Sequence, residues 1–286
     1  SLLPVSAGRK FSGRISDKIA DRKADGKMQT MIDTDEIQEL LRQAGALFED
    51  KAAAGHAREK GPADYVTEVD VMVQQYIREY LERRYPLVQF LSEEKTNDEI
   101  DRSAPVWVLD PVDGTTNLIH DYHASVISLA LMEEGRMILA FVYNPYSREL
   151  FMAREGEGCY CNGRQVHVSQ ASCMQESLIA IGTSPYYKEL AAENFDLFHR
   201  LFMDCQDIRR SGSAALELAY VACGRLDGYL ERNLKLWDFA AGMLLVREAG
   251  GCVLDYSGAQ MKPDMASDLV AGNAEVVREL VGYMDK

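Results

Sequence analysis

The chain has 286 residues, 47% of them hydrophobic, and a formal net charge of −14 at pH 7. This length and apolar content can bury a core in one large domain or two closely packed ones, which excludes a fibrous or disordered class. The negative charge argues against a general affinity for nucleic acid or anionic membranes, because both attract basic surfaces.

The cysteines and the hydropathy of the chain indicate its cellular compartment. No apolar run reaches the roughly 18 residues of a transmembrane helix, so we expect no membrane association. The cysteines form no CxxC pair and no dense framework, which favours a reduced, cytoplasmic protein. They are Cys159, Cys161, Cys173, Cys205, Cys223 and Cys252.

Residues 1–30 differ from the rest of the chain because they are basic and hold few large apolar side chains. They lack the apolar region of a signal peptide, so export is not expected. We interpret them as a flexible or non-native extension, with Met31 as the natural start. An RNA-binding or organelle-targeting arm is the alternative.

The segment 31–170 is predicted to form an N-terminal half of helices and strands. Thr34 begins the first helix, with Asp35 and Glu36 in its first turn, a favourable arrangement for a helix start. A second amphipathic helix is expected from Val69 to Leu81. Closely spaced apolar runs separated by polar turns then predict an antiparallel meander. These runs are 126–132, 137–144 and 150–154.

The segment 171–286 has a different pattern, in which strands and helices alternate. Such alternation predicts a layered α/β half. The expected strands are 177–182, 207–210, 227–231, 252–255 and 268–271, and the expected helices are 188–202, 213–223, 238–249 and one from Ala274. We expect the substrate cleft where the two halves meet, because domain interfaces favour clefts.

An acidic turn, Asp110-Pro111-Val112-Asp113-Gly114-Thr115-Thr116-Asn117, follows the apolar strand 106–109. Two carboxylates three residues apart can share one space, where Mg²⁺ finds its oxygen ligands. Gly114 permits close backbone approach, and the amides of Gly114 and Thr115 can then donate to a phosphate. The motif therefore indicates metal-assisted phosphoester hydrolysis. Alone, the motif would favour a solvated Asp-Gly turn, because Asp and Gly are ordinary turn residues.

Two further motifs favour the functional interpretation. Glu93-Glu94 lies upstream, and Trp237-Asp238-Phe239-Ala240-Ala241-Gly242 lies far downstream. In order and spacing, the three motifs resemble the inositol monophosphatase family of metal-dependent, lithium-sensitive phosphatases. The resemblance extends from Ile37 to the C-terminus and implies a layered αβαβα sandwich.

The resemblance also implies a metal site. Glu93, Asp110 and the main-chain carbonyl of Val112 would hold one Mg²⁺. Asp110 would bridge to a second ion completed by Asp113 and Asp238, and the family's weaker third ion would share Glu93. As the expected first residue of a helix, Asp238 could simply be an N-cap, and we predict that it is both cap and ligand.

The catalytic and substrate-binding residues are implied in the same way. Asp70 and Glu94 would stand near the attacking water, and Thr115 with Asp70 would help to deprotonate it. The polyol hydroxyls would meet residues in the second half, which are Gly212, Ser213, Ala214, Glu231 and Lys235. For Lys235, plain solvent exposure is an equal alternative. The Arg209-Arg210 pair is left unassigned.

The resulting expectation is a Mg²⁺-dependent phosphatase that hydrolyses inositol 1-phosphate, tolerates other sugar or polyol monophosphates and forms a homodimer. Within the superfamily, the alternatives are fructose 1,6-bisphosphate, 3′-phosphoadenosine 5′-phosphate and histidinol phosphate as substrates. A different class of function is a regulatory binding protein that retains the fold.

Overall fold

The computed structural model describes residues 32–61, 64–93, 100–101, 103–263 and 266–284. The fold described below is that of the compact unit Asp35–Lys286. The extension 1–30, Met31 and Glu94 lie outside the described residues. The predicted division into halves at residue 170 stays a prediction.

A seven-stranded sheet forms the first large element, in the order β3-β4-β5-β6-β7-β8-β9. The strand β4 pairs with β3 in parallel and with β5 antiparallel, and the later neighbours are all antiparallel. The predicted meander is therefore confirmed. The strands are β3 (Gln89–Ser92), β4 (Val106–Asp113), β5 (Val126–Glu133), β6 (Arg136–Asn144), β7 (Glu149–Arg154), β8 (Gly158–Cys161) and β9 (Arg164–Val166).

A five-stranded sheet follows in the order β11-β10-β12-β14-β13. The strand β10 runs parallel to β11 and β12, whereas β14 runs antiparallel to β12 and β13. The strands are β10 (Leu178–Ile181), β11 (Asp207–Arg209), β12 (Gly228–Lys235), β13 (Cys252–Leu254) and β14 (Ala266–Gly272).

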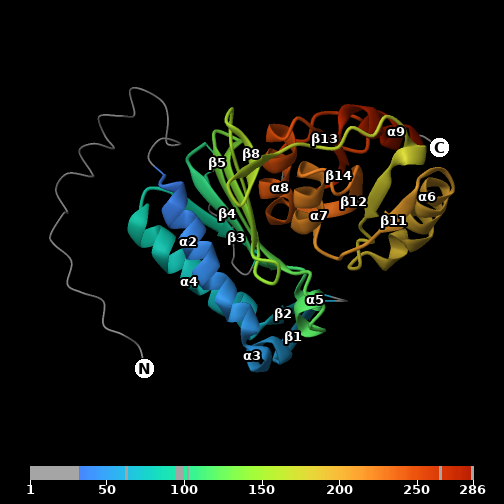
Figure 1. Cartoon of the computed structure of the whole chain (residues 1–286). Helices are drawn as coiled ribbons and strands as arrows, with labels where there is room; N and C mark the ends of the chain where they lie inside the picture. Colours follow the sequence, from blue (N-terminus) through green and yellow to red (C-terminus); the bar gives the residue numbers. More distant parts are fainter. Residues whose placement is uncertain (1–31, 62–63, 94–99, 102, 264–265, 285–286) are drawn as a thin grey trace. The chain divides into compact units, whose positions relative to one another are not determined.

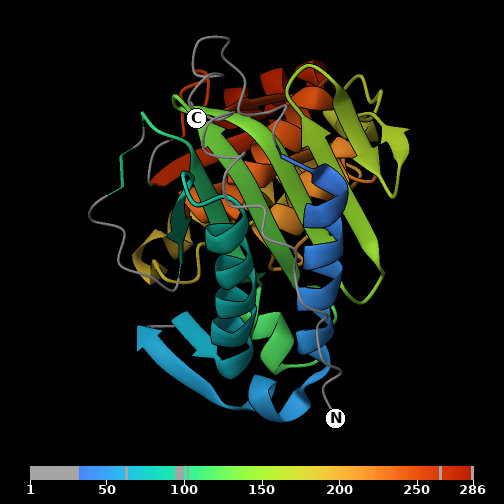
Figure 2. The same cartoon turned by 90° about the vertical axis from the view of Figure 1, so that its left-hand side faces the viewer.

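Helices cover both sheets and fill the space between them. The helices α2 (Thr34–Gly45) and α4 (Glu68–Arg84) run side by side over one face of the large sheet (Figure 2). Between the sheets lie α7 (Ala214–Ala222) and α8 (Leu236–Glu248), and α6 (Ala191–Asp204) and α9 (Ala274–Met284) lie beyond the small sheet (Figure 1). The predicted αβαβα sandwich is thus confirmed.

The position of α8 follows from its composition. Its side chains are apolar almost all round, and nine of its residues, from Leu236 to Val246, are buried. A helix without a polar face must be covered on every side, and α8 packs against both sheets. On the outer face of the small sheet, a second apolar cluster joins α6 and α9 to the strands.

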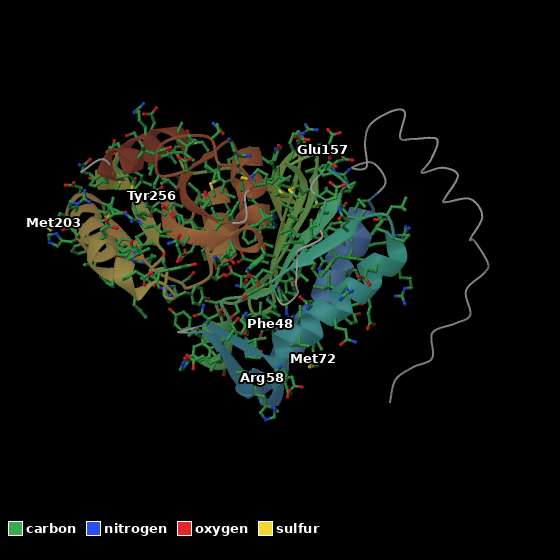
Figure 3. All side chains as sticks on the ribbon, turned by 180° about the vertical axis from the view of Figure 1, so that it is seen from behind. Phe48, Arg58, Met72, Glu157, Met203 and Tyr256 are labelled. Atoms are coloured by element: carbon green, nitrogen blue, oxygen red, sulfur yellow. The ribbon has the colours of Figure 1, made fainter. Side chains whose placement is uncertain are left out.

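Some elements were not expected. A hairpin of β1 (Ala57–Gly61) and β2 (Asp64–Thr67) precedes α4, and its mostly exposed first strand carries Arg58 (Figure 3). The short helices α3 (Lys51–Gly55) and α5 (Thr115–Ile119) and the 3-10 turns η2 (Ala46–Glu49), η3 (Met174–Glu176) and η4 (Lys188–Leu190) complete the unit. None of the described helices is long and apolar enough to cross a membrane.

Candidate active site

A cavity of about 380 Å³ collects most of the predicted site residues. It lies beside the end of β4, the start of α7 and the start of α8. The predicted residues in its lining are Glu93, Asp110, Val112, Asp113, Gly114, Thr115, Gly212, Ser213, Ala214, Glu231, Lys235 and Asp238.

The acidic turn is shaped by an irregularity at the end of a buried strand. The pairing of β4 with β5 shifts register between Asp110 and Asp113, where Pro111 has no amide to donate. Such bulges re-aim side chains next to functional sites. Gly114 then takes a left-handed φ of +90°, which favours glycine, and α5 begins at Thr115.

Asp70 and Thr115 come together from distant segments. Asp70 is fully buried at the third position of α4, where its Oδ2 accepts from the backbone amide of Thr67 at 2.9 Å. Its other oxygen, Oδ1, lies 3.0 Å from Thr115 Oγ1. The same hydroxyl lies 3.1 Å from the carbonyl oxygen of Val112. Thr115 therefore links the cavity lining to a buried carboxylate.

Asp113 joins the acidic turn to the start of α7. Its Oδ2 accepts a 2.6 Å hydrogen bond from Ser213 Oγ and another of 2.6 Å from the backbone amide of Ala215. The carboxylate thus satisfies donors that the first turn of a helix leaves unpaired. As a consequence, the predicted substrate segment 212–214 lies beside Asp113.

Asp238 corrects a sequence prediction. It is the third residue of α8 rather than its cap, because the helix begins at Leu236. The cap position belongs to Lys235, whose backbone amide donates to Asp238 Oδ2 at 2.7 Å. This is the reverse arm of a capping box, in which a side chain at the third position reaches back to the cap.

The carboxylates of the cavity affect one another's ionisation. Burial raises the pKa of Asp110 and Asp238 well above the ordinary range. Glu93 and Asp113 raise both further, because neighbouring negative charges disfavour the ionised form. Burial raises the pKa of Asp113 to about 6, against the hydrogen bond from Ser213, which lowers it.

The donor set suits a hard divalent cation, which prefers carboxylate and carbonyl oxygens. Within the described residues, each of three carboxylates accepts hydrogen bonds from protein donors through one oxygen. These oxygens are Asp110 Oδ1, Asp113 Oδ2 and Asp238 Oδ2. Glu93 pairs with Lys60 Nζ at 2.8 Å. Across the same residues, no three His, Cys, Asp or Glu side chains form a ready-made metal cluster.

Glu231 lines the cavity, as do the other residues predicted to bind substrate. Its carboxylate accepts from the Ser184 amide at 2.9 Å and from Tyr229 Oη at 2.6 Å, and burial raises its pKa. It also lies directly over Gly182, where a Cβ would be 1.9 Å from Glu231 Cδ. These contacts fix the carboxylate in one orientation.

Lys235 is held by an aromatic residue that sequence reasoning missed. The strand β12 continues past the predicted end at residue 231, through a register shift in which Asn233 takes a φ of +57°. This extension brings Lys235 to the cavity, where Nζ lies 3.1 Å from Tyr187 Oη. Plain solvent exposure of Lys235 is therefore wrong.

The fold and the cavity define a layered α/β protein with a carboxylate-lined site. The model of the inositol monophosphatase family matches residues 28–283. The chain belongs to this family, whose members generally use Mg²⁺.

The chain is similar to two named relatives and to one solved structure. The chain is 40% identical over 231 residues to the Nus factor SuhB of Escherichia coli strain K12, covering 81% of this chain and 86% of that protein. It is 39% identical over 221 residues to the inositol-1-monophosphatase of Rhizobium meliloti, covering 77% and 83%. The crystal structure of the extragenic suppressor protein suhB from Bartonella henselae superposes with a TM-score of 0.82 at 34% identity, covering 88% of this chain and 98% of that one.

Proposed function

We propose that this protein is a Mg²⁺-dependent phosphomonoesterase that prefers inositol 1-phosphate. The observation that carries the proposal is the Asp70–Thr115 contact at the wall of a cavity lined by acidic residues. Family membership supports a phosphatase, and the positions of Glu231 and the segment 212–214 support a polyol as leaving group.

The predicted cation ligands are Glu93, Asp110, Asp113, Asp238 and the carbonyl of Val112. Bound Mg²⁺ would supply positive charge that polarises the phosphate and lowers the pKa of water. This charge also answers an electrostatic difficulty, because a cavity rich in carboxylates would otherwise repel an anionic ester.

The chain itself supplies the proton acceptor. Thr115 Oγ1 lies between the cavity and Asp70 Oδ1, so a proton from the attacking water can pass through the hydroxyl to the buried carboxylate. Asp70 is well placed to hold it, because burial shields it from bulk solvent. Glu94, which the sequence also assigns to this step, stays a prediction.

The substrate would span two segments. The amides of Gly114 and Thr115 are predicted to hold the phosphate, and Gly212 to Ala214 the polyol hydroxyls. Glu231 can accept from a hydroxyl because each of its oxygens has two lone pairs, and the bonds from Ser184 and Tyr229 use one apiece.

A substrate panel tests the proposal. Phosphate release is measured from inositol 1-phosphate, fructose 1,6-bisphosphate and 3′-phosphoadenosine 5′-phosphate in Mg²⁺, with and without a chelator. Chelator-sensitive release with inositol 1-phosphate preferred supports both the chemistry and the specificity. Preference for another ester would retain the chemistry and reject the specificity, and no release from any ester would reject both.

Glu231→Gln is expected to lower kcat/KM for inositol 1-phosphate by roughly 10- to 100-fold, because a hydrogen bond to a charged group contributes about 1.5–3 kcal/mol. Steady-state kinetics with p-nitrophenyl phosphate, which has no hydroxyls to offer, provide the comparison, and there we expect only a small change. An equal loss on both esters would remove Glu231 from the specificity residues.

Mg²⁺ is expected to stabilise the fold more at neutral than at acidic pH. The folded-state pKa of Asp113 is about 6 against an ordinary 3.8, so the stability contributed by its protonated form is lost as pH rises through 6. Near neutral pH the ionised carboxylates repel one another until a cation binds. In thermal unfolding, saturating Mg²⁺ should raise Tm by roughly 5 °C or more at about pH 7.5, and by less at about pH 5. Equal shifts would contradict this, and NaCl of equal ionic strength is the control.

A second candidate function is a regulatory binding role, and the 40% identity to a protein named Nus factor SuhB favours it. It requires no catalysis, so an absence of phosphate release together with a Mg²⁺-dependent Tm shift would favour it over hydrolysis. Lithium sensitivity and the homodimer, which the family resemblance implies, stay predictions.

A further inference from the structure

Asn117 ends the acidic turn, and the proposed chemistry gives it no role. Its side chain is 7% exposed. The amide nitrogen Nδ2 donates to the carbonyl oxygen of Ala124 at 2.8 Å and to that of Ser211 at 2.9 Å. The second bond joins residues 94 positions apart in the chain. Asn117 therefore ties the acidic turn directly to the segment 211–213.

The two segments approach each other through glycines. Gly114 and Gly212 both have left-handed φ angles, +90° and +86°. A Cβ at Gly114 would lie 3.2 Å from the carbonyl oxygen of Gly212, and one at Gly212 would lie 3.3 Å from Asn117 Oδ1. Backbone meets backbone here, and two side chains of the turn bridge the segments. Asp113 bonds to Ser213 and Ala215, and Asn117 bonds to Ser211.

A buried carboxylate holds the same segment from the other side. Glu217 Oε1 accepts from the backbone amide of Ser211 at 2.6 Å, and Glu217 is 3% exposed on α7. Ser211 is thus bonded through its carbonyl to Asn117 and through its amide to Glu217. We call Asn117, Ser211 and Glu217 the Ser211 clamp.

We propose that Asn117 and Glu217 are positioning residues, and that the Ser211 clamp sets the preference for polyol phosphates over simple phosphomonoesters. The proposal rests on the proposed function, in which the turn holds phosphate and the segment 212–214 holds hydroxyls. A polyol ester must meet both at once, so it depends on their spacing. An ester without hydroxyls depends on the turn alone. Small misplacements in such an arrangement have large effects on rate.

The test compares Asn117→Ala, Glu217→Leu and Glu217→Gln on inositol 1-phosphate and p-nitrophenyl phosphate, with kcat and KM measured separately. We expect Asn117→Ala and Glu217→Leu to lower kcat/KM for inositol 1-phosphate by roughly tenfold or more, largely through KM, and to change the other ester much less. Glu217→Gln keeps a carbonyl oxygen for the Ser211 amide, so it should restore most of the preference.

Ser125→Ala is the matched control. Ser125 is fully buried and its hydroxyl donates to the carbonyl oxygen of Gly114 at 2.8 Å, so it supports the same turn through a bond that does not involve Ser211. We expect its ratio of the two kcat/KM values to equal that of the wild type. A ratio that falls equally in Ser125→Ala would overturn the proposal, because general loosening of the turn would then explain the effect.

Three further outcomes are also informative. Unchanged ratios in Asn117→Ala and Glu217→Leu reject the Ser211 clamp as a determinant of preference. If Asn117→Ala does not fold, the Glu217→Leu and Glu217→Gln pair decides by the same criterion. A wild-type protein that releases phosphate from neither ester instead rejects the proposed function and this inference with it, and that result is reached without any variant.

Discussion

Asp113→Asn is expected to lower phosphate release from inositol 1-phosphate by about 100-fold or more while the protein stays folded. The substitution removes one negative charge where cation binding contributes several kcal/mol to transition-state stabilisation, and each 1.4 kcal/mol is about tenfold in rate. The fold is retained because the Asn carbonyl oxygen can still accept from Ser213 Oγ and the Ala215 amide, as Asp113 Oδ2 does.

Asp121→Asn is the matched control for that experiment, since Asp121 is an exposed acid in the loop after the same turn. Circular dichroism would establish folding, and the Mg²⁺-induced shift in Tm would report on cation binding. Activity within a few-fold of the wild type in Asp113→Asn would show that the metal assignment is wrong.

Thr115→Val is expected to lower kcat by about 100-fold or more, because it removes the hydroxyl through which a proton can reach Asp70, and general base catalysis contributes about 10²–10⁴-fold. The side chains have nearly the same shape, so little else changes. The Mg²⁺-induced Tm shift should stay at the wild-type value, which separates this defect from loss of the cation.

The neighbouring Thr116 provides the comparison. It is exposed, carries the same hydroxyl and lies one residue further along α5. We expect Thr116→Val to retain kcat. If both threonine variants lost activity alike, the effect would belong to α5 as a whole, and the Asp70–Thr115 assignment would have to be abandoned.

Much of the fold could be predicted because the pattern of apolar and polar residues in each segment matches the helix or strand that the segment forms. The meander was readable from apolar runs separated by short polar turns, and α2 from its acidic first turn and apolar spacing. The hairpin of β1 and β2 was not, because the exposed sequence Ala57–Gly61 shows no alternation of apolar and polar residues. The pairing with Asp64–Thr67 joins neighbouring segments, so the missing signal is this alternation and not a distance along the chain.

The candidate site divides in the same way. The acidic turn could be recognised in the sequence because its carboxylates, glycine and threonine lie within a few consecutive residues. The start of α8 was misplaced by two residues, because Lys235 and Leu236 carry no capping side chain and the cap is supplied backward by Asp238. The contact of Tyr229 with Glu231 could have been predicted from the sequence, since residues two apart on a strand share a face. The bond from Asn117 to Ser211 was not, because only the tertiary fold brings them together.

The bonds that Asp70, Asp113 and Asp238 make to helix starts have an evolutionary consequence. Asp70 and Asp238 accept from the amides of the cap residues Thr67 and Lys235, and Asp113 accepts from the Ala215 amide in the first turn of α7. The loss of any of them therefore weakens the scaffold whether or not the protein hydrolyses anything. Thr115 is half-buried and caps no helix. In a lineage no longer selected for turnover, the three acids would be retained because they stabilise the fold. Thr115 would be the first of these residues to be substituted.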